Sequence, residues 1–435
     1  MRAACMRSML ACFRMADARM APHVADPGSR PRPTPDGFRK NPVGRWARYL
    51  LLSLLCLVAF GASAAAPRIA VMTMQPGEIF FERFGHDAIV VVDPQSGEAT
   101  SYNFGFFDMD EPGFAGRFAL GDMQYYLVAL PLQQDLSYYR QVGRGVKLQW
   151  LDLAPEQAQS LADALAEHAK PENARYRYDY FTSNCSTQVR DALNKAMGGA
   201  LKPQMIGRSR GNTFRSEAVR LASPAPWMWL GFDIGLGPYA DVPMSRWEEA
   251  YVPMRLADSL EQARNSAGRP LVQSEQVLVP HRIAPEPPER ARRWWPWLLA
   301  GLFVATLIML VAPRKPRLVA GLALPFWLLC GVIGAVLVFL WGFTEHHAGW
   351  ANRNLLLFNP LCLLLAPGAV AVLRKRAPAA WFHWLLLFIA AAAASAWMVL
   401  WLSVNPQVNQ AWVALLLPVH AALAYVFVPG RGMLR

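Results

Sequence analysis

Cys185 is the cysteine of this sequence whose surroundings best suit a reactive thiol. It stands within the segment 182–187, which is rich in Ser, Thr and Asn, directly before an amphipathic helical pattern that starts at Ser186. Free N–H groups and the helix dipole at such a position stabilise a negatively charged sulfur. We therefore expect the pKa of the thiol to be lowered and Cys185 to be nucleophilic. A structural thiol is the alternative interpretation.

A thiol nucleophile needs a general base. His86 is the best-placed histidine, because it stands at the entrance to a predicted strand and the preceding Gly85 permits close approach of another backbone. His168 lies near the end of a predicted helix and His281 lies in a predicted tether, and neither position suggests catalysis. We therefore predict that His86 is the base for Cys185.

The base in turn needs an acceptor that orients its ring. Asn103 lies on the next predicted strand, and a β-turn between the two strands would bring it beside His86. Its side-chain oxygen could then accept the ring N–H, as in Cys-His-Asn sites. Asp87 and Asp93 are alternative acceptors, and the residues leave this choice open. The backbone N–H of Cys185 would form part of an oxyanion hole.

The part of the chain that carries these residues is predicted to be exported. Basic residues precede an apolar run at 49–60, and small residues at 61–66 suit a signal-peptidase site near 64–66. A retained signal anchor is the alternative, although the run is short for a membrane span. Residues 1–44 are rich in Arg, Pro and Met without periodicity, so we predict no fold there, and a later Met such as Met20 is an alternative start.

Cysteine positions argue against a disulfide-rich domain, and the distribution of charge argues against a nucleic-acid-binding protein. The six cysteines are Cys5, Cys12, Cys56, Cys185, Cys330 and Cys362. The first three precede the predicted cleavage site and the last two lie in apolar runs, so the exported domain has no disulfide framework. The formal net charge is +12, but residues 1–48 hold 10 Lys and Arg against 3 Asp and so account for +7 of it. The remaining charge gives no reason to expect nucleic acid as a partner.

The C-terminal third of the chain is predicted to be a membrane domain, in keeping with an overall apolar content of 54%. Five spans are expected, at 297–312, 318–343, 355–373, 381–403 and 411–428. Basic loops at 314–317 and 374–376 place the exported domain outside by the positive-inside rule.

The predicted outer side of this membrane domain carries unusual polar groups. The loop 344–354 is dense in ionisable and amide side chains, and the span after it is interrupted by Asn359 and two prolines, so we expect that span to be broken or packed around a polar cavity. Arg290, Arg292 and Arg293 could bind lipid headgroups or act as ordinary interfacial anchors. His346 and His347 lack an evident third ligand, so a metal site is not favoured.

The exported domain has the pattern of an α+β fold. Strands are expected at 69–72, 88–92, 100–104, 125–130 and 146–151, followed by helices at 155–168 and 186–197. The predicted organisation is an unstructured or wrongly assigned start (1–44), a signal peptide (45–66), a thiol domain (67–258), a tether (259–293) and a membrane domain (294–435).

Three motifs of the exported domain resemble the periplasmic domain of Lnb-type lipoprotein N-acyltransferases. They are Gly85-His86-Asp87-Ala88, Tyr102-Asn103-Phe104-Gly105, and Asn184-Cys185-Ser186-Thr187 with Arg190 one turn on. The resemblance continues through Arg215 and the segments 237–241 and 247–253, and into the polar span at 352–361. That family is similar to the circularly permuted NlpC-like papain fold of lecithin:retinol acyltransferase, in which His precedes Cys.

The resemblance implies an acyltransferase of the bacterial inner membrane whose catalytic domain faces the periplasm. Cys185 would take a fatty acyl chain from a phospholipid and pass it to the N-terminal amine of a diacylglyceryl lipoprotein, with no cofactor and no metal. The implied catalytic residues are Cys185, His86 and Asn103, and the supporting or substrate-binding residues are Asn184, Tyr102, Arg190, Asn352, Asn354 and Asn359.

Two other functions remain open. One is a membrane-anchored cysteine hydrolase on the same fold, either a peptidoglycan endopeptidase or amidase or a lipase. The other is a non-enzymatic membrane assembly protein with a structural Cys185.

Overall fold

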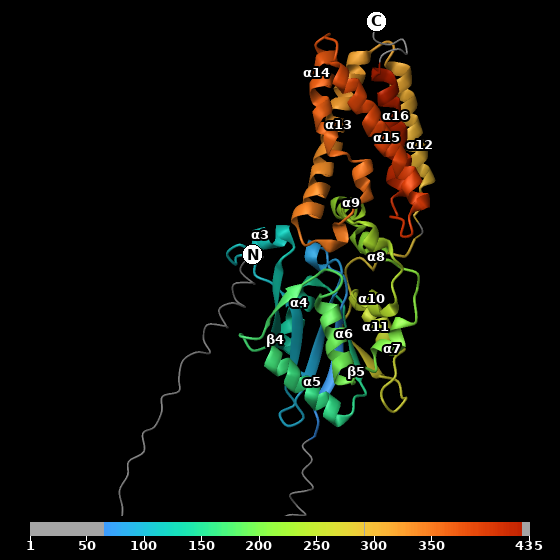
Figure 1. Ribbon diagram of the computed structural model, residues 1–435. Coiled ribbons are helices and arrows are strands. Elements are labelled where there is room, and N and C mark those ends of the chain that lie inside the picture. The colour runs from blue at the N-terminus through green and yellow to red at the C-terminus, as the bar shows by residue number, and fades with distance from the viewer. Residues whose placement is uncertain (1–64, 291, 429–435) are drawn as a thin grey trace, which may run out of the picture. The chain divides into compact units, whose positions relative to one another are not determined.

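The computed structural model describes residues 65–290 and 292–428. The predicted start (1–44) and the predicted signal peptide (45–66) lie outside these residues, apart from Ala65 and Ala66. The described chain forms a mixed α/β domain built on an antiparallel sheet, followed by a helical domain with several apolar helices (Figure 1).

The sheet has seven strands in the order β6-β4-β3-β2-β1-β5-β7, and every neighbouring pair is antiparallel. The strands are β1 (Arg68–Met74), β2 (His86–Val92), β3 (Ala99–Phe106), β4 (Met123–Pro131), β5 (Val146–Leu151), β6 (Arg175–Tyr178) and β7 (Val272–Val279). All five predicted strands are present. The predicted tether differs from the structure, because β7 lies within it and pairs with β5 as an edge strand.

Helices cover both faces of the sheet. One face packs Ile89 and Phe104 against α5 (Pro155–His168) and α6 (Cys185–Ala196), whose apolar stripes match the predicted helices. The other face packs Ala88 and Val90 against α4 (Leu132–Val142). Because side chains alternate between faces along a strand, β2 contributes to both cores.

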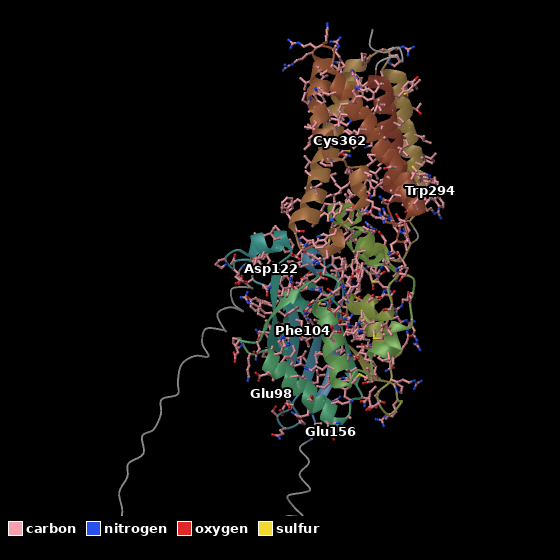
Figure 2. The ribbon with its side chains drawn as sticks, in the orientation of Figure 1. Glu98, Phe104, Asp122, Glu156, Trp294 and Cys362 are labelled. Atoms are coloured by element: carbon pink, nitrogen blue, oxygen red, sulfur yellow. The ribbon has the colours of Figure 1, made fainter. Side chains whose placement is uncertain are left out.

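Short elements complete the α/β domain. They are η1 (Phe80–Glu82), α3 (Phe114–Leu120), α7 (Lys202–Ile206), α8 (Phe214–Ala222), α9 (Pro226–Gly235), η2 (Pro238–Asp241), α10 (Arg246–Glu249) and α11 (Pro253–Glu261). Figure 2 shows Phe104 inside this domain, with Glu98 of the β2–β3 turn and Glu156 of α5 at one end of it.

The helical domain has helical segments within each of the five ranges predicted as spans. Its elements are α12 (Trp295–Val311), α13 (Pro316–Phe343), η3 (His347–Gly349), η4 (Arg353–Leu356), η5 (Pro360–Leu365), α14 (Ala366–Leu373), α15 (Ala380–Leu402) and α16 (Gln410–Phe427). In the described part of the chain, α13, α15 and α16 are long and apolar enough to cross a membrane, and α12 is shorter.

The polar third span is broken, as its sequence predicts. The helical segments His347–Leu356 and Pro360–Leu373 meet at an angle of 42° and together could form one further span. At the break, the side chain of His420 in α16 lies 3.0 Å from the Leu357 carbonyl oxygen. A backbone group freed by the interruption therefore finds a partner inside the protein, as an apolar environment requires.

Candidate thiol site

The start of α6 is fixed by Asn184, its N-cap residue. The Asn184 Oδ1 accepts a hydrogen bond from the Thr187 N–H at 2.9 Å, and the Thr187 hydroxyl accepts one from the Asn184 N–H at 2.7 Å. The amide group of Asn184 also donates to the carbonyl oxygens of Tyr180 and Tyr251, at 3.0 and 2.8 Å. Asn184 therefore positions the helix start, and with it Cys185, rather than contacting a substrate.

The Cys185 thiol lies against the start of β2. Backbone N–H groups of Asp87, Ser186 and Cys185 itself form hydrogen bonds that favour the thiolate. Because the N–H of Asp87 belongs to the peptide bond that follows His86, the sulfur lies next to the backbone of the predicted base. Part of Cys185 stays accessible.

Gly105 makes room for this approach. The pairing of β2 with β3 ends at Ala88 and Asn103, two residues short of His86 on one strand and of Gly105 on the other. Gly105 has a φ of +93° at an irregularity of the strand, and a Cβ there would lie 3.6 Å from the Cys185 Cβ. Gly85 does permit the close approach of another backbone, as predicted, because a Cβ on Gly85 would lie 2.8 Å from the Met74 carbonyl oxygen.

The structure brings Asn103 to the ring of His86. The His86 Nε2 lies 3.1 Å from the Asn103 Oδ1. The Asn103 amide nitrogen donates to Asp135 Oδ2 at 3.0 Å and to Ser101 Oγ at 3.2 Å, and this fixes which end of the amide faces the histidine. An oxygen facing Nε2 requires the ring proton on that nitrogen, so Nδ1 is left as the free acceptor.

The two alternative orienting residues lie elsewhere. Asp93 is in the β2–β3 turn at the far end of β2, where its Oδ1 accepts from the N–H groups of Gln95 and Ser96. Asp87 is fully buried and faces Thr73 and Ser186. Among the three candidates, Asn103 is the residue with a recorded contact to the His86 ring.

The pKa of the thiol is shifted in the direction opposite to the expectation. Burial raises the pKa of Cys185 to about 12, and a charge on Asp87 would raise it further, against the backbone N–H groups that lower it. Burial, followed by the positive charge of Arg144, lowers the pKa of His86 to about 4, although its contact with Asn103 opposes this. Desolvation therefore outweighs the helix terminus, and both groups are neutral at pH 7.

Asp87 keeps its proton to a higher pH than a free Asp does, and about half of the molecules carry it at pH 7. The Ser186 hydroxyl lies 2.7 Å from Asp87 Oδ2 and 2.7 Å from the Ala250 carbonyl oxygen, but it has one hydrogen to donate. Since the carbonyl can only accept, Ser186 donates to Ala250 and accepts from a protonated Asp87. Thr73 donates to the other carboxyl oxygen at 2.7 Å. Burial raises the pKa of Asp87 to about 7, in agreement with this proton count.

Several residues of this site were not predicted from the sequence. Asp135 and Ser101 support Asn103, and Arg144 acts on His86 from a buried ion pair with Glu82 at 3.2 Å. The sequence did offer a signal for Asp135, because it lies on the apolar side of the amphipathic pattern of α4, and a buried carboxylate needs hydrogen-bond partners.

Two predicted supporting residues have structural contacts. Arg190 stacks over the Trp247 ring at 4.0 Å and donates to the Trp247 carbonyl oxygen at 2.6 Å, which ties α6 to α10. Tyr102 is opposite Ile89 and packs against the core under α5 and α6.

The polar residues of the broken span bind the end of α9 instead of lining a site. The Asn352 amide donates to the carbonyl oxygens of Ile234, Gly235 and Leu236, at 2.8, 2.9 and 3.1 Å. The Asn354 amide donates to Ile234 at 2.9 Å. These bonds satisfy the C-terminal carbonyls of α9 and join the two domains.

Two further polar groups near the predicted outer boundary are also structural. Asn359 Oδ1 accepts from the Leu361 N–H at 3.0 Å and so begins η5. Arg292 pairs with the buried Asp233 of α9, which also accepts from Trp412 Nε1 at 2.6 Å, and this argues against lipid headgroups as its main partner.

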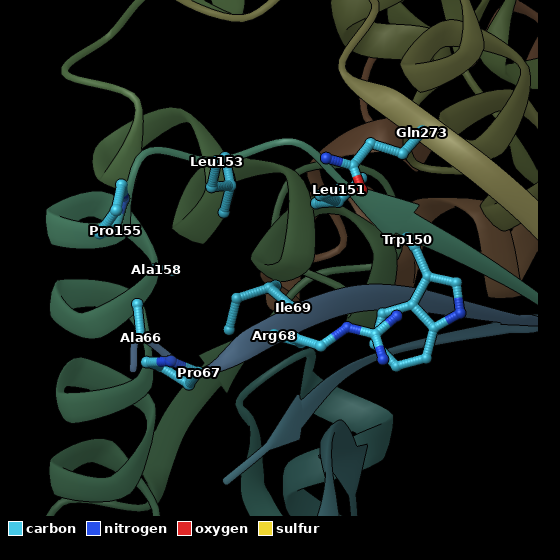
Figure 3. Close-up of a pocket in the computed structure, with 10 residues that line it drawn as sticks. All are labelled: Ala66, Pro67, Arg68, Ile69, Trp150, Leu151, Leu153, Pro155, Ala158 and Gln273. Atoms are coloured by element: carbon cyan, nitrogen blue, oxygen red, sulfur yellow. The ribbon is translucent and has the colours of Figure 1, made fainter. Parts of the chain in front are cut away.

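A pocket of about 200 Å³ lies away from the thiol (Figure 3). Arg68, whose guanidinium lies 4.1 Å from the centre of the Trp150 ring, lines it at the first residue of β1. His86 pairs with Met74 at the last residue of β1, roughly 20 Å away along the strand. No group of three or more His, Cys, Asp or Glu side chains within residues 65–290 and 292–428 could hold a metal ion.

Replacing Asp87 with Asn tests the proton on this carboxyl. An amide has a donor and an acceptor in the same places, but it does not titrate. The unfolded wild-type carboxyl ionises near pH 3.8 and the folded one near 7, so wild-type stability should fall relative to the variant as pH rises between these values and then level off. Melting temperatures in detergent, measured from pH 4 to 9, check this.

Asp93→Asn is the matched control, since hydrogen bonds from Ser96 and Gln95 lower the pKa of that exposed carboxyl. Its stability difference from wild type should stay constant above about pH 6, because Asp93 is ionised in both states there. A wild-type advantage over Asp87→Asn that grows with pH would show that Asp87 is ionised in the folded protein.

Comparisons with known proteins cover most of the described chain. The Lnb N-terminal periplasmic domain model matches residues 62–213, and the Lnb transmembrane domain model matches residues 294–428. No curated protein and no solved structure matches the chain. The first match contains His86, Asn103 and Cys185, and the second contains the broken span. This chain is therefore a membrane protein with a periplasmic domain and belongs to the Lnb-type family.

Proposed function

We propose that this protein is a thiol acyltransferase of the bacterial inner membrane, with its catalytic domain in the periplasm. It moves a fatty acyl chain from a phospholipid to the N-terminal amine of a diacylglyceryl lipoprotein through a thioester on Cys185. The observation that carries the proposal is the His86–Asn103 contact beside a thiol at a helix N-terminus. Membership of the Lnb-type family supplies the acceptor class.

The first half-reaction starts from two neutral groups. The Cys185 sulfur attacks the ester carbonyl carbon while His86 Nδ1 takes the thiol proton, so the thiolate forms only as the new bond does. Asn103 holds the ring proton on Nε2 and stabilises the imidazolium that results. The tetrahedral intermediate then expels the lysophospholipid alkoxide, which receives the proton from His86. The products are an acyl-Cys185 thioester and a lysophospholipid.

The second half-reaction reverses these roles. The neutral α-amine of the lipoprotein attacks the thioester carbonyl and gives a proton to His86. Collapse of the intermediate breaks the C–S bond, forms the amide, and returns the proton to the departing sulfur. Because the acyl group rests on the enzyme between two substrates, the kinetics should be ping-pong.

The topology supports a circularly permuted papain-like assignment. His86 and Asn103 lie on adjacent strands that precede the nucleophile helix in the chain, and α6 packs across β2 and β3. The partial burial of Cys185 and His86 also suits this chemistry, since it limits the access of water to a thioester that water would hydrolyse.

Trapping the acyl-enzyme tests this function. We expect the full chain, incubated with phospholipid vesicles carrying an isotope-labelled acyl chain and no acceptor, to give a labelled, hydroxylamine-sensitive Cys185 peptide by mass spectrometry. His86→Ala should slow its formation by about 10²–10⁴-fold. Addition of a diacylglyceryl peptide should move the label to the peptide amine.

Cys362→Ser serves as the control for loss of a thiol, because Cys362 is buried in the membrane domain. Label that appears elsewhere and persists in Cys185→Ser would contradict the acyltransferase. Label on Cys185 that is released as free fatty acid, and never as an acylated peptide, would favour a lipase.

A further inference from the structure

Four large apolar side chains are exposed on elements near the thiol site, and we call them the aromatic patch: Phe80, Phe81, Leu120 and Trp227. Their exposed fractions are 42, 49, 46 and 66% respectively. Phe80 and Trp227 stack with their ring centres 5.9 Å apart. Exposed aromatic side chains gathered in this way mark an interaction surface.

Two elements that carry the patch are bound directly to the membrane domain. Leu230 and Ile234, on the same helix as Trp227, pack against the core of the membrane domain. At the end of α3, the Leu120 carbonyl oxygen accepts from the Glu345 N–H at 2.7 Å, just after the last turn of α13. The stack of Phe80 on Trp227 joins η1 to the same region.

Trp227 lies within two helical turns of the part of α9 that contacts the membrane domain. Seven residues separate it from Ile234, which corresponds to roughly 10 Å of helix. Trp294 and Trp295, exposed by 45 and 50%, mark the outer end of α12. Tryptophan and other aromatic side chains favour the headgroup level of a bilayer, where their apolar surface leaves water.

We propose that the aromatic patch inserts into the outer leaflet at the level of the lipid headgroups and upper acyl chains. Phe81 is the first of a series of ring contacts through Phe107, Tyr125 and Tyr178, at 5.5, 4.9 and 4.2 Å. Tyr178 lies close enough to Cys185 to act on it electrostatically. If the acyltransfer function holds, this series lies between the leaflet and the thiol.

Spin labels on single cysteines test the insertion. In a chain with its native cysteines replaced, a label at Trp227→Cys in phospholipid nanodiscs should be several-fold more accessible to oxygen than to a water-soluble nickel chelate. Val277→Cys on β7 is the matched control, because Val277 is 68% exposed and lies on the edge strand of the sheet. The ratio should reverse there.

A label at Phe81→Cys provides a second position in case Trp227→Cys does not fold. Water-like accessibility at 227 or 81, equal to that at 277, would overturn the proposal. Because the spin-labelled variants lack Cys185, the accessibility result does not depend on acyl transfer.

A second inference comes from a different observation, the hydroxyl of Tyr176. This oxygen is buried. Among the described residues, the backbone N–H of Gly105 is directed at it, but its O–H has no acceptor within hydrogen-bond geometry. A Cβ placed on Gly105 would lie 3.8 Å from it and 3.6 Å from the Cys185 Cβ, so both groups border the same small space. Burial raises the pKa of Tyr176, so the phenol keeps its proton.

We infer that Tyr176 donates a hydrogen bond to the oxyanion that forms when Cys185 attacks a carbonyl carbon, together with the Cys185 N–H. This inference rests on the proposed function. It gives a role to a buried O–H that has no acceptor among the described residues, since a donor reserved for the transition state is not paired in the ground state.

Tyr176→Phe removes this hydroxyl and nothing else. We expect acyl-Cys185 to form about 10²-fold more slowly, with alkylation of Cys185 by iodoacetamide changed less than about twofold, because alkylation builds no oxyanion. Tyr126→Phe is the control, since that hydroxyl bonds Glu111 on the neighbouring surface.

Wild-type acylation rates in Tyr176→Phe, or an equal loss of acylation and alkylation, would overturn the role. Failure of the wild-type protein itself to form acyl-Cys185 would instead count against the proposed function.

Discussion

The site depends on the contact between the start of α6 and β2. Asn184 begins the helix, and the Ser186 hydroxyl links it to buried Asp87 in the strand, whose pKa burial raises to about 7. An ionised Asp87 would repel a forming thiolate. The protonated form of Asp87 therefore does two things: it holds Cys185 beside the His86–Asp87 peptide, and it leaves the sulfur free of a nearby negative charge.

Low polarity around the site has a consequence for its chemistry. Helix N–H groups favour a thiolate, but the loss of water around the sulfur costs more, so the resting pair is thiol and imidazole instead of an ion pair. In such a pair the thiol is a weak nucleophile until a bound substrate allows His86 to take its proton. In a periplasm that oxidises reactive thiolates, a neutral resting thiol would also protect the enzyme between turnovers.

Local patterns in the sequence were sufficient for β1 to β5, for α5 and α6, for the broken span and for the proximity of Asn103 to His86, because a β-turn fixes which residues of a hairpin face each other. They missed β6 and β7. Contacts between distant segments were not accessible in this way. Asp135 reaches Asn103 across 32 residues, and Asn352 reaches α9 across 118, so neither partner could be read from spacing. The direction of the pKa shift of Cys185 also depends on burial, which a sequence motif does not reveal.

The central claim is that Cys185 rests as a neutral thiol. The most direct measurement is the rate of its alkylation by iodoacetamide as a function of pH, with the full chain in nanodiscs. Our account predicts a rate that rises about tenfold per pH unit from about pH 7 to pH 10 without a plateau, because the thiolate fraction is still far from saturation. A plateau with its midpoint between about pH 5 and pH 8 would contradict it, because it would show a stable thiolate in the resting enzyme.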